Sequence, residues 1–392
     1  MEKQKNIPYL RFPEFEGEWV KKKLGELSII NPTTDKLPDK FIYIDLESVI
    51  NGDLTKELIV FKNEAPSRAQ RVLKKDDILF QMVRPYQKNN LYFDKSGDYV
   101  ASTGYAQIKT KQNSRFIYQY LHLQKFVDEV IEKCTGTSYP AINSKDLAKI
   151  SICYPTLPEQ QKIASFFTAI DQKIFQLKRK KTLLEEYKKG VMQKIFSQEI
   201  RFKDDNGQEF PKWEKKTGDA LFETVSNKNH NSDLPILAIT QEHGAIPRDM
   251  IDYYITVSEQ SVESYKVVEK GDFIISLRSF QGGIEYSEYK GICSPAYIIL
   301  RATQRIDHRY FKYYFKTGKY ITDLNRKLEG IRDGKMISFR YFSEIKINVP
   351  SLPEQTKIAN FLSAIDDKIN HTINQIEKAE VWKKGLMQQM FV

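Results

Sequence analysis

The sequence predicts a mixed α/β fold in which two pseudo-repeated globular domains are separated by long helices that pair as an antiparallel coiled coil. Residues 155–174 and 350–369 are identical at 14 of 20 positions, which indicates an internal duplication. Apolar residues then recur at alternating steps of three and four, as in a supercoiled helix. Short β-branched and aromatic runs precede each copy and predict strands.

Each copy of the repeated segment begins with a helix-start signal. Thr156 and Ser351 each stand three residues before a glutamate, so we expect a capping box at the start of both helices. About 39 residues at 1.5 Å each would form a rod of roughly 58 Å. The alternative is that each helix only covers its own globular half.

The seam of these helices is predicted to be the surface through which they pack on each other and on partners. Its main apolar positions are Ile163, Phe167, Ile170, Ile174, Leu177 and Leu184 in the first copy and Ile358, Leu362, Ile365 and Ile369 in the second. Thr372, Ala379 and Lys383 interrupt the seam of the second copy, which predicts looser packing there.

The globular halves share one order of elements. In the first half, strand-like runs occur at 41–46, 58–61, 78–83, 91–93 and 106–109, and a helix-like stretch follows at 115–133. In the second half, the runs are at 236–240, 253–257, 273–277 and 297–300, with a helix near 308–327. Strands followed by one main helix predict a mixed α/β domain of about 150 residues.

Composition favours a phosphate-rich partner. The 392 residues include 61 basic and 51 acidic side chains, a net charge of +10, although solubility alone is an equally good explanation. No stretch is long and apolar enough for a membrane span, and residues 1–15 lack the apolar core of a signal peptide. Three widely spaced cysteines fit a reducing cytoplasm.

The loops of both halves carry side chains that suit base and phosphate contacts. Arginine pairs with guanine, asparagine or glutamine pairs with adenine, and lysine holds phosphates. The candidate DNA-binding residues are Arg84, Tyr86, Lys88, Asn89 and Tyr105 in the first half and His230, Arg248, Arg278, Gln281 and Tyr297 in the second. The basic run 178–181 is interpreted as a solvated helix face rather than a DNA contact.

No catalytic residue or metal ligand is predicted. The segment 330–336 lacks the hydroxyl residue of a phosphate loop, and Asn31-Pro32-Thr33 lacks the aromatic tail of an amino-methyltransferase motif. A nuclease-like triplet at 288–290, with Asp272 upstream, is expected by chance in a chain so rich in Glu and Lys. The five histidines show no metal-ligand spacing.

The repeated Leu-Pro-Glu-Gln-x-x-Lys-Ile-Ala segment, leading into Ala-Ile-Asp-x-Lys-Ile, resembles the spacer regions of type I restriction–modification specificity subunits. The resemblance covers essentially the whole chain. It implies a target-recognition domain at 1–154, a central helix at 155–196, a second recognition domain at 197–349 and a C-terminal helix at 350–392.

The resemblance also implies a function. Each recognition domain would read one half of a split, asymmetric site in double-stranded DNA, and the helices would set the gap and bind two modification subunits. Those partners would carry S-adenosylmethionine, and restriction subunits would add ATP- and Mg-dependent translocation and cleavage, so this chain would hold no cofactor. The rival interpretations are a restriction enzyme with built-in specificity and a coiled-coil adaptor that binds only proteins.

Overall fold

The computed structural model describes residues 6–33, 36–231, 233–251, 262–277, 279–326 and 337–392. The chain forms two compact units. Unit 1 comprises residues 1–178 and 374–392, and unit 2 comprises residues 179–373. Each unit therefore takes one globular half and one part of each long helix.

Unit 1 contains β1 to β12 and α1 to α4. Its strands are β1 Val20–Lys23, β2 Ser28–Ile30, β3 Lys40–Ile44, β4 Val49–Ile50, β5 Asp53–Leu54, β6 Leu58–Phe61, β7 Ala69–Val72, β8 Ile78–Gln81, β9 Leu91–Tyr92, β10 Tyr99–Ser102, β11 Tyr105–Thr110 and β12 Ser151–Tyr154. Its helices are α1 Leu24–Leu27, η1 Lys62–Glu64, η2 Pro85–Gln87, α2 Ser114–Tyr120, α3 Gln124–Glu132 and α4 Ser144–Lys149.

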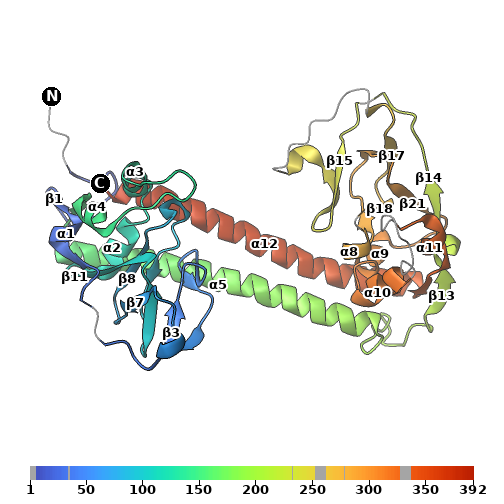
Figure 1. Ribbon diagram of the computed structural model, residues 1–392. Helices are drawn as coiled ribbons and strands as arrows, with labels where there is room; N and C mark the ends of the chain where they lie inside the picture. Colours follow the sequence, from blue (N-terminus) through green and yellow to red (C-terminus); the bar gives the residue numbers. More distant parts are fainter. Residues whose placement is uncertain (1–5, 34–35, 232, 252–261, 278, 327–336) are drawn as a thin grey trace. The chain divides into compact units, whose positions relative to one another are not determined.

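A central sheet in the order β2-β11-β8-β9 forms the frame of unit 1 (Figure 1). A second, separate sheet has the order β6-β3-β10-β7. Strand β1, at the start of the domain, pairs antiparallel with β12 at its end. Strand β8 is buried at all four positions because it lies in the middle of its sheet. The main core joins the frame sheet and helices α2 and α3 to Trp19, and it includes Phe167 from one long helix and Phe391, which directly follows the other.

Unit 2 repeats the frame sheet of unit 1, but its described residues form two two-stranded sheets in place of the second four-stranded sheet. Its strands are β13 Glu214–Thr217, β14 Phe222–Val225, β15 Leu237–Thr240, β16 Gly244–Pro247, β17 Lys266–Val268, β18 Phe273–Ile275, β19 Glu285–Tyr286, β20 Gly291–Cys293, β21 Ile298–Ala302 and β22 Lys346–Val349. Its helices are α6 Gly218–Leu221, η3 Arg248–Met250, α8 Ser279–Gly282, α9 His308–Tyr314, α10 Gly318–Arg326 and α11 Phe339–Glu344.

The frame sheet of unit 2 has the order β14-β21-β18-β19, which matches that of unit 1 strand for strand. The pairing of β13 with β22 likewise matches that of β1 with β12. The core is aromatic: Phe222, Phe273 and Phe311 are fully buried and their rings contact edge to face. The duplication seen in the sequence is therefore a duplication of the fold.

The predicted strands at 58–61, 78–83 and 106–109 correspond to β6, β8 and β11. The single helix expected at 115–133 is wrong, because α2 ends at Tyr120 and α3 begins at Gln124. The break lets Leu121 and Leu123 both enter the core, and no glycine or proline marks it. The predicted strand 253–257 and the segment 330–336 lie outside the described residues, as does the end of the predicted helix 308–327.

The long helices are α5, Leu157–Phe196, and α12, Leu352–Met390. In unit 1 their segments lie side by side (Figure 1), with Lys383 bonded to Asp171 and Lys178 bonded to Glu380. Higher numbers on α5 meet lower numbers on α12, so the pair is antiparallel, as predicted. In unit 2, Lys188 bonds Asp366 at 2.5 Å, which repeats the Lys383–Asp171 pair with the helices exchanged.

The seam is closed in the second copy, contrary to the expected looseness. Thr372 is fully buried and its hydroxyl donates to the Lys368 carbonyl at 2.8 Å. The Lys383 ammonium forms an ion pair with the Asp171 carboxylate at 2.6 Å. Polar residues are therefore accommodated because each finds a partner, which removes the cost of burying an unpaired polar group.

The predicted capping boxes are wrong, although both helices begin where the pattern placed them. Glu159 accepts two bonds of 2.8 Å from the Arg11 guanidinium, and Glu354 is bonded in the same way by Arg201. Both carboxylates are essentially buried, and the Ser351 hydroxyl has no partner among the described residues. The glutamates thus anchor the segment preceding β1 or β13 to the helix instead of capping it.

The glutamine of the repeated segment is also structural. The Gln160 amide donates to the Pro155 carbonyl at 2.8 Å and accepts from the Asn113 amide just before α2. Gln355 does the same with the Pro350 carbonyl and the Asp307 amide before α9. Each Glu-Gln pair therefore ties its helix to three other segments of one unit.

Candidate nucleic-acid interface

The loop between β8 and β9 of unit 1 holds the best-formed candidate site. Its single 3-10 turn is flanked by Arg84 and Lys88, whose φ angles of 53° and 54° are left-handed. Such a conformation costs a non-glycine residue about 1 kcal/mol or more, so the surrounding contacts must hold it. The Arg84 amide donates to the Pro140 carbonyl at 2.8 Å, and Asn90 accepts from the Gln81 amide at 2.9 Å.

The Arg84 side chain is held flat and retains free donors. Its guanidinium lies 4.2 Å from the centre of the Tyr139 ring, within the range of a cation–π contact. Its buried Nε has no hydrogen-bond partner, and none of the described carboxylates pairs with it. A planar cation with spare N–H groups suits bidentate contact with a guanine edge or a phosphate.

Exposed aromatic rings adjoin Arg84 on this surface. Tyr86 is 50% exposed and Tyr139 is 64% exposed. Sequence reasoning does not find Tyr139, because it lies in a polar stretch without periodicity, 55 residues after Arg84. Its closeness to Arg84 depends on the bridges that Ala141 makes with Val83 and Thr135.

Three other residues of unit 1 that were predicted to bind DNA are hydrogen-bonded or buried within the protein. The Lys88 ammonium donates to the His122 carbonyl at 3.1 Å and to Gln124 at 2.9 Å, and burial lowers its pKa. The Asn89 side chain accepts from the Asn51 amide. Tyr105 is fully buried in the β11 strand, and burial raises its pKa. Tyr105 therefore offers no surface to a partner in this structure.

Unit 1 contains a second arginine of the same kind that the sequence analysis missed. Arg71, on β7, is partly buried, and burial lowers the pKa of its guanidinium. Its Nε is also without a hydrogen-bond partner among the described residues. A desolvated arginine without a counter-ion is costly to the fold, which makes it a candidate for binding an anion.

The candidates in unit 2 lie on different segments. Gln281 is exposed on α8 and Arg248 begins the η3 turn after β16. The His230 ring lies 3.1 Å from the Tyr265 carbonyl, and the Tyr297 carbonyl accepts from the Lys266 ammonium. Arg278 lies outside the described residues.

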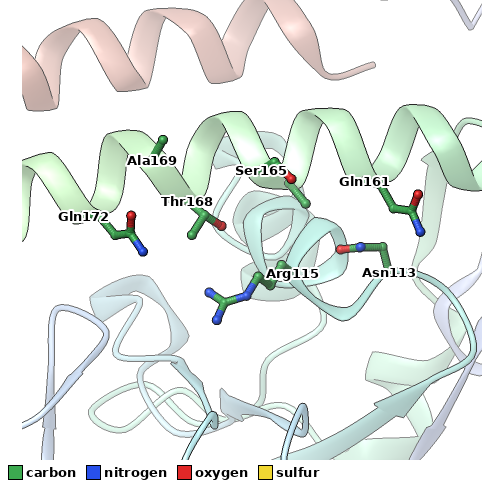
Figure 2. A pocket seen from close by; sticks show the side chains of 8 residues that line it. Asn113, Arg115, Gln161, Ser165, Thr168, Ala169 and Gln172 are labelled. Atoms are coloured by element: carbon green, nitrogen blue, oxygen red, sulfur yellow. The ribbon is translucent and has the colours of Figure 1, made fainter.

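A groove of about 580 Å³ lies beside the first turns of α5 in unit 1 (Figure 2). Arg115, from α2, points into it below Thr168, Ser165 and Gln161 of α5. The Arg115 guanidinium lies 4.1 Å from the Tyr92 ring. The residues that line the groove include no histidine, cysteine or carboxylate, so it offers no acid–base pair.

The side chains of the nuclease-like triplet are not gathered into a site. Asp272 is bonded by Arg301, Glu288 by Lys312, and Lys290 by the separate carboxylate of Glu269. Across the described residues, no group of three histidine, cysteine or acidic side chains is placed to hold a metal. None of the described helices combines the length and apolarity required to cross a membrane.

The predicted partner seam on the helices is buried inside the units. Its members Ile163, Phe167, Ile170 and Ile174 pack in the core of unit 1, and Ile358, Leu362, Ile365 and Ile369 pack in that of unit 2. Leu177 is buried and Leu184 is partly buried. The exposed large hydrophobic residues of the helices are different ones, namely Leu157, Phe175, Leu183, Tyr187, Val381 and Trp382.

A duplicated frame whose two copies carry different loops fits a two-part recognition subunit. A family model for the type I restriction modification DNA specificity domain matches the chain twice, over residues 16–186 and 213–378. The chain belongs to this family of specificity subunits, which recognise DNA and are not catalytic.

Several known proteins are similar over nearly the full length. A putative type I restriction enzyme MjaX specificity subunit and the MjaVIII specificity subunit, both from Methanocaldococcus jannaschii, are 25% and 23% identical. The matches cover 98% of this chain in both cases and 95% and 93% of those chains. The solved S subunit of a type I system from M. genitalium has the same fold, with a TM-score of 0.59, 16% identity and coverage of 98% and 99%.

Proposed function

We propose that each unit reads one half of a bipartite, asymmetric site in double-stranded DNA. The observation that carries the proposal is the state of Arg84, which is fixed in a left-handed backbone, stacked on Tyr139 and left with an unpaired Nε. A preorganised cation loses little conformational entropy when it binds, which favours affinity. Because the Nε is buried, the guanidinium would contact DNA through its terminal N–H groups.

The difference between the units supports two separate readouts. Their frame sheets have the same strand order, whereas the loops after β8 and β18 differ in conformation. The first loop forms a 3-10 turn between two left-handed residues, and the second contains α8. A shared frame with unlike loops would present different side chains to two different half-sites.

Domain exchange tests this division. Residues 20–154 would be replaced by the corresponding part of a related subunit, and N6-methyladenine would be mapped in a host that also expresses the modification subunit. We expect one half of the methylated motif to change and the other half to persist. A change in both halves would contradict independent readout, and no split motif from the unmodified chain would contradict the proposed function.

The long helices would set the gap between the half-sites. Each helix runs from the core of one unit into the core of the other, so its length is part of both units. Seven residues added to each helix, after Lys178 and after Ile373, would lengthen each by about 10.5 Å and nearly keep the helical phase. We expect a longer gap or no methylation, and an unchanged motif would refute the ruler role.

The same helices would bind two modification subunits. Tyr187 and Trp382 occupy equivalent positions 195 residues apart, and they are 53% and 55% exposed. Large exposed aromatic residues are typical of protein interfaces. One such residue in each unit, at the same place of the repeat, fits one copy of the same partner on each unit.

Single substitutions separate the two docking surfaces. Trp382→Ser and Tyr187→Ser should each convert a complex with two modification subunits into one with a single copy, measured by native mass spectrometry. Leu58→Ser is the matched control, because Leu58 is 62% exposed but belongs to β6 and to neither long helix. Retention of both copies by both variants would place the partners elsewhere.

The chemistry would reside on the partners. We infer that S-adenosylmethionine is bound by the modification subunits, and ATP and magnesium by restriction subunits. The purified chain alone should leave DNA unmethylated, and the addition of the modification subunit should restore methylation at the split site. Methylation by the chain alone would favour an enzyme with built-in specificity. Association with protein partners that does not depend on salt, without any binding of DNA, would favour an adaptor.

A further inference from the structure

Lys316 of unit 2 joins three segments that surround the predicted reading loop. Its ammonium donates to the Gly282 carbonyl at 3.0 Å, to the Gln241 carbonyl at 3.4 Å and to the Glu285 carboxylate at 2.6 Å. Gly282 is in α8, Gln241 follows β15, and Glu285 begins β19. A lysine has three N–H donors, so these contacts use all of them.

The acceptor carboxylate depends on this lysine. The Glu285 side chain is 2% exposed, and burial raises its pKa while Lys316 opposes the shift. Its second oxygen has no hydrogen-bond partner among the described residues. Loss of the lysine would leave an uncompensated buried carboxylate, so the local structure would rearrange or take up a proton.

In unit 1, the residue at the corresponding position also bonds the loop that follows the middle strand of the frame sheet. His122 lies two residues beyond α2, as Lys316 lies two residues beyond α9. Its ring Nε2 is 3.4 Å from the Asn90 amide nitrogen, and its carbonyl accepts from Lys88. In both units, the residue after this helix therefore fastens the loop that leaves the middle of the frame sheet.

We propose that Lys316 is a positioning residue for DNA reading, which fixes the α8 loop and the turn after β15 so that Gln281 is presented in one orientation. The inference rests on the proposed function of unit 2. Because all three N–H donors of the ammonium are bonded within the protein, Lys316 would affect DNA reading by holding the loop in place and not by contacting a phosphate. Discrimination at one half-site depends on it, although it contacts no base.

The test uses the full chain in complex with modification subunits and the half-sites assigned by domain exchange. Lys316→Met is compared with Lys312→Met, which removes an exposed lysine one turn earlier that bonds Glu288. Equilibrium binding is measured on the cognate DNA and on DNA with one base changed in either half-site. A single base change typically costs about 5- to 150-fold in affinity.

We expect Lys316→Met to reduce discrimination at the unit 2 half-site at least about tenfold and to leave the unit 1 half-site within about twofold. Lys312→Met should keep both ratios. Uniform weakening on all DNAs, with a salt slope reduced by about one, would show a direct phosphate contact and overturn the proposal. Unchanged ratios at both half-sites would also overturn it.

A conservative pair protects the test against misfolding. Glu285→Gln keeps an acceptor for Lys316 without the buried charge, so it should retain discrimination at both half-sites. If Lys316→Met does not fold, the double variant Lys316→Met/Glu285→Gln, which removes the buried charge together with its counter-ion, takes its place with the same expected loss. Failure of the unmodified complex to discriminate at either half-site would instead refute the proposed function itself.

Discussion

Replacement of Arg84 by glycine should separate binding from stability. Glycine relieves the left-handed strain at φ 53°, which is worth about 1 kcal/mol. Two losses of stability oppose this gain. The greater freedom of glycine in the unfolded chain costs about 0.5–1 kcal/mol, and the loss of the Tyr139 contact costs about 0.5–1 kcal/mol. The terms nearly cancel, so the Tm of unit 1 should move by less than about 4 °C.

DNA binding should respond quite differently. A good bidentate arginine–base contact is worth about 1–3 kcal/mol, which corresponds to roughly 5- to 150-fold in affinity. Arg84→Gly should lose this factor on the cognate site only. Arg84→Lys keeps the charge but not the planar fork, so it should lose discrimination while retaining non-specific binding.

The assay combines calorimetry of the free subunit with fluorescence anisotropy of the assembled complex on cognate and single-mismatch DNA. Cognate affinity within twofold of the unsubstituted complex would refute the role assigned to Arg84. A fall in Tm of more than about 10 °C would show that Arg84 is chiefly structural and that the estimate of the strain is wrong.

Other substitutions test the contacts that stabilise each unit and its DNA-binding surface. Arg11→Met and Arg201→Met should each cost about 3–5 kcal/mol by leaving a buried glutamate unpaired, and each should lower only its own unit's transition in calorimetry. Equal shifts in both transitions would contradict the division. Burial lowers the pKa of His122 to about 4, below its ordinary 6.5, so neutral His122 stabilises unit 1 above pH 6.5. That contribution, about 3 kcal/mol at most, should disappear between pH 6.5 and 4 in urea titrations, and His122→Gln should abolish this part of the slope. Tyr139→Ala should weaken cognate binding severalfold with little change in Tm, and an unchanged affinity would remove Tyr139 from the interface.

The sequence by itself determined the duplication, the two long helices and the family. These features are local or repeated: the 195-residue spacing and the heptad pattern are visible without any knowledge of distant contacts. It also proposed Arg84 together with Arg278, because both halves place an arginine just after the corresponding strand. It could not separate Arg84 from Lys88 and Tyr105, since residue type does not report whether a side chain is already bonded or buried.

Tertiary structure alone decided which of the repeated residues meet. Glu159 looked like a cap but is bonded by Arg11, and Asp171 finds its lysine on the other copy's helix, at Lys383. Each of these contacts closes a loop of more than a hundred residues. The physical reason is that a periodic pattern encodes the face that a helix buries, whereas the partner on that face is chosen by the packing of the whole unit.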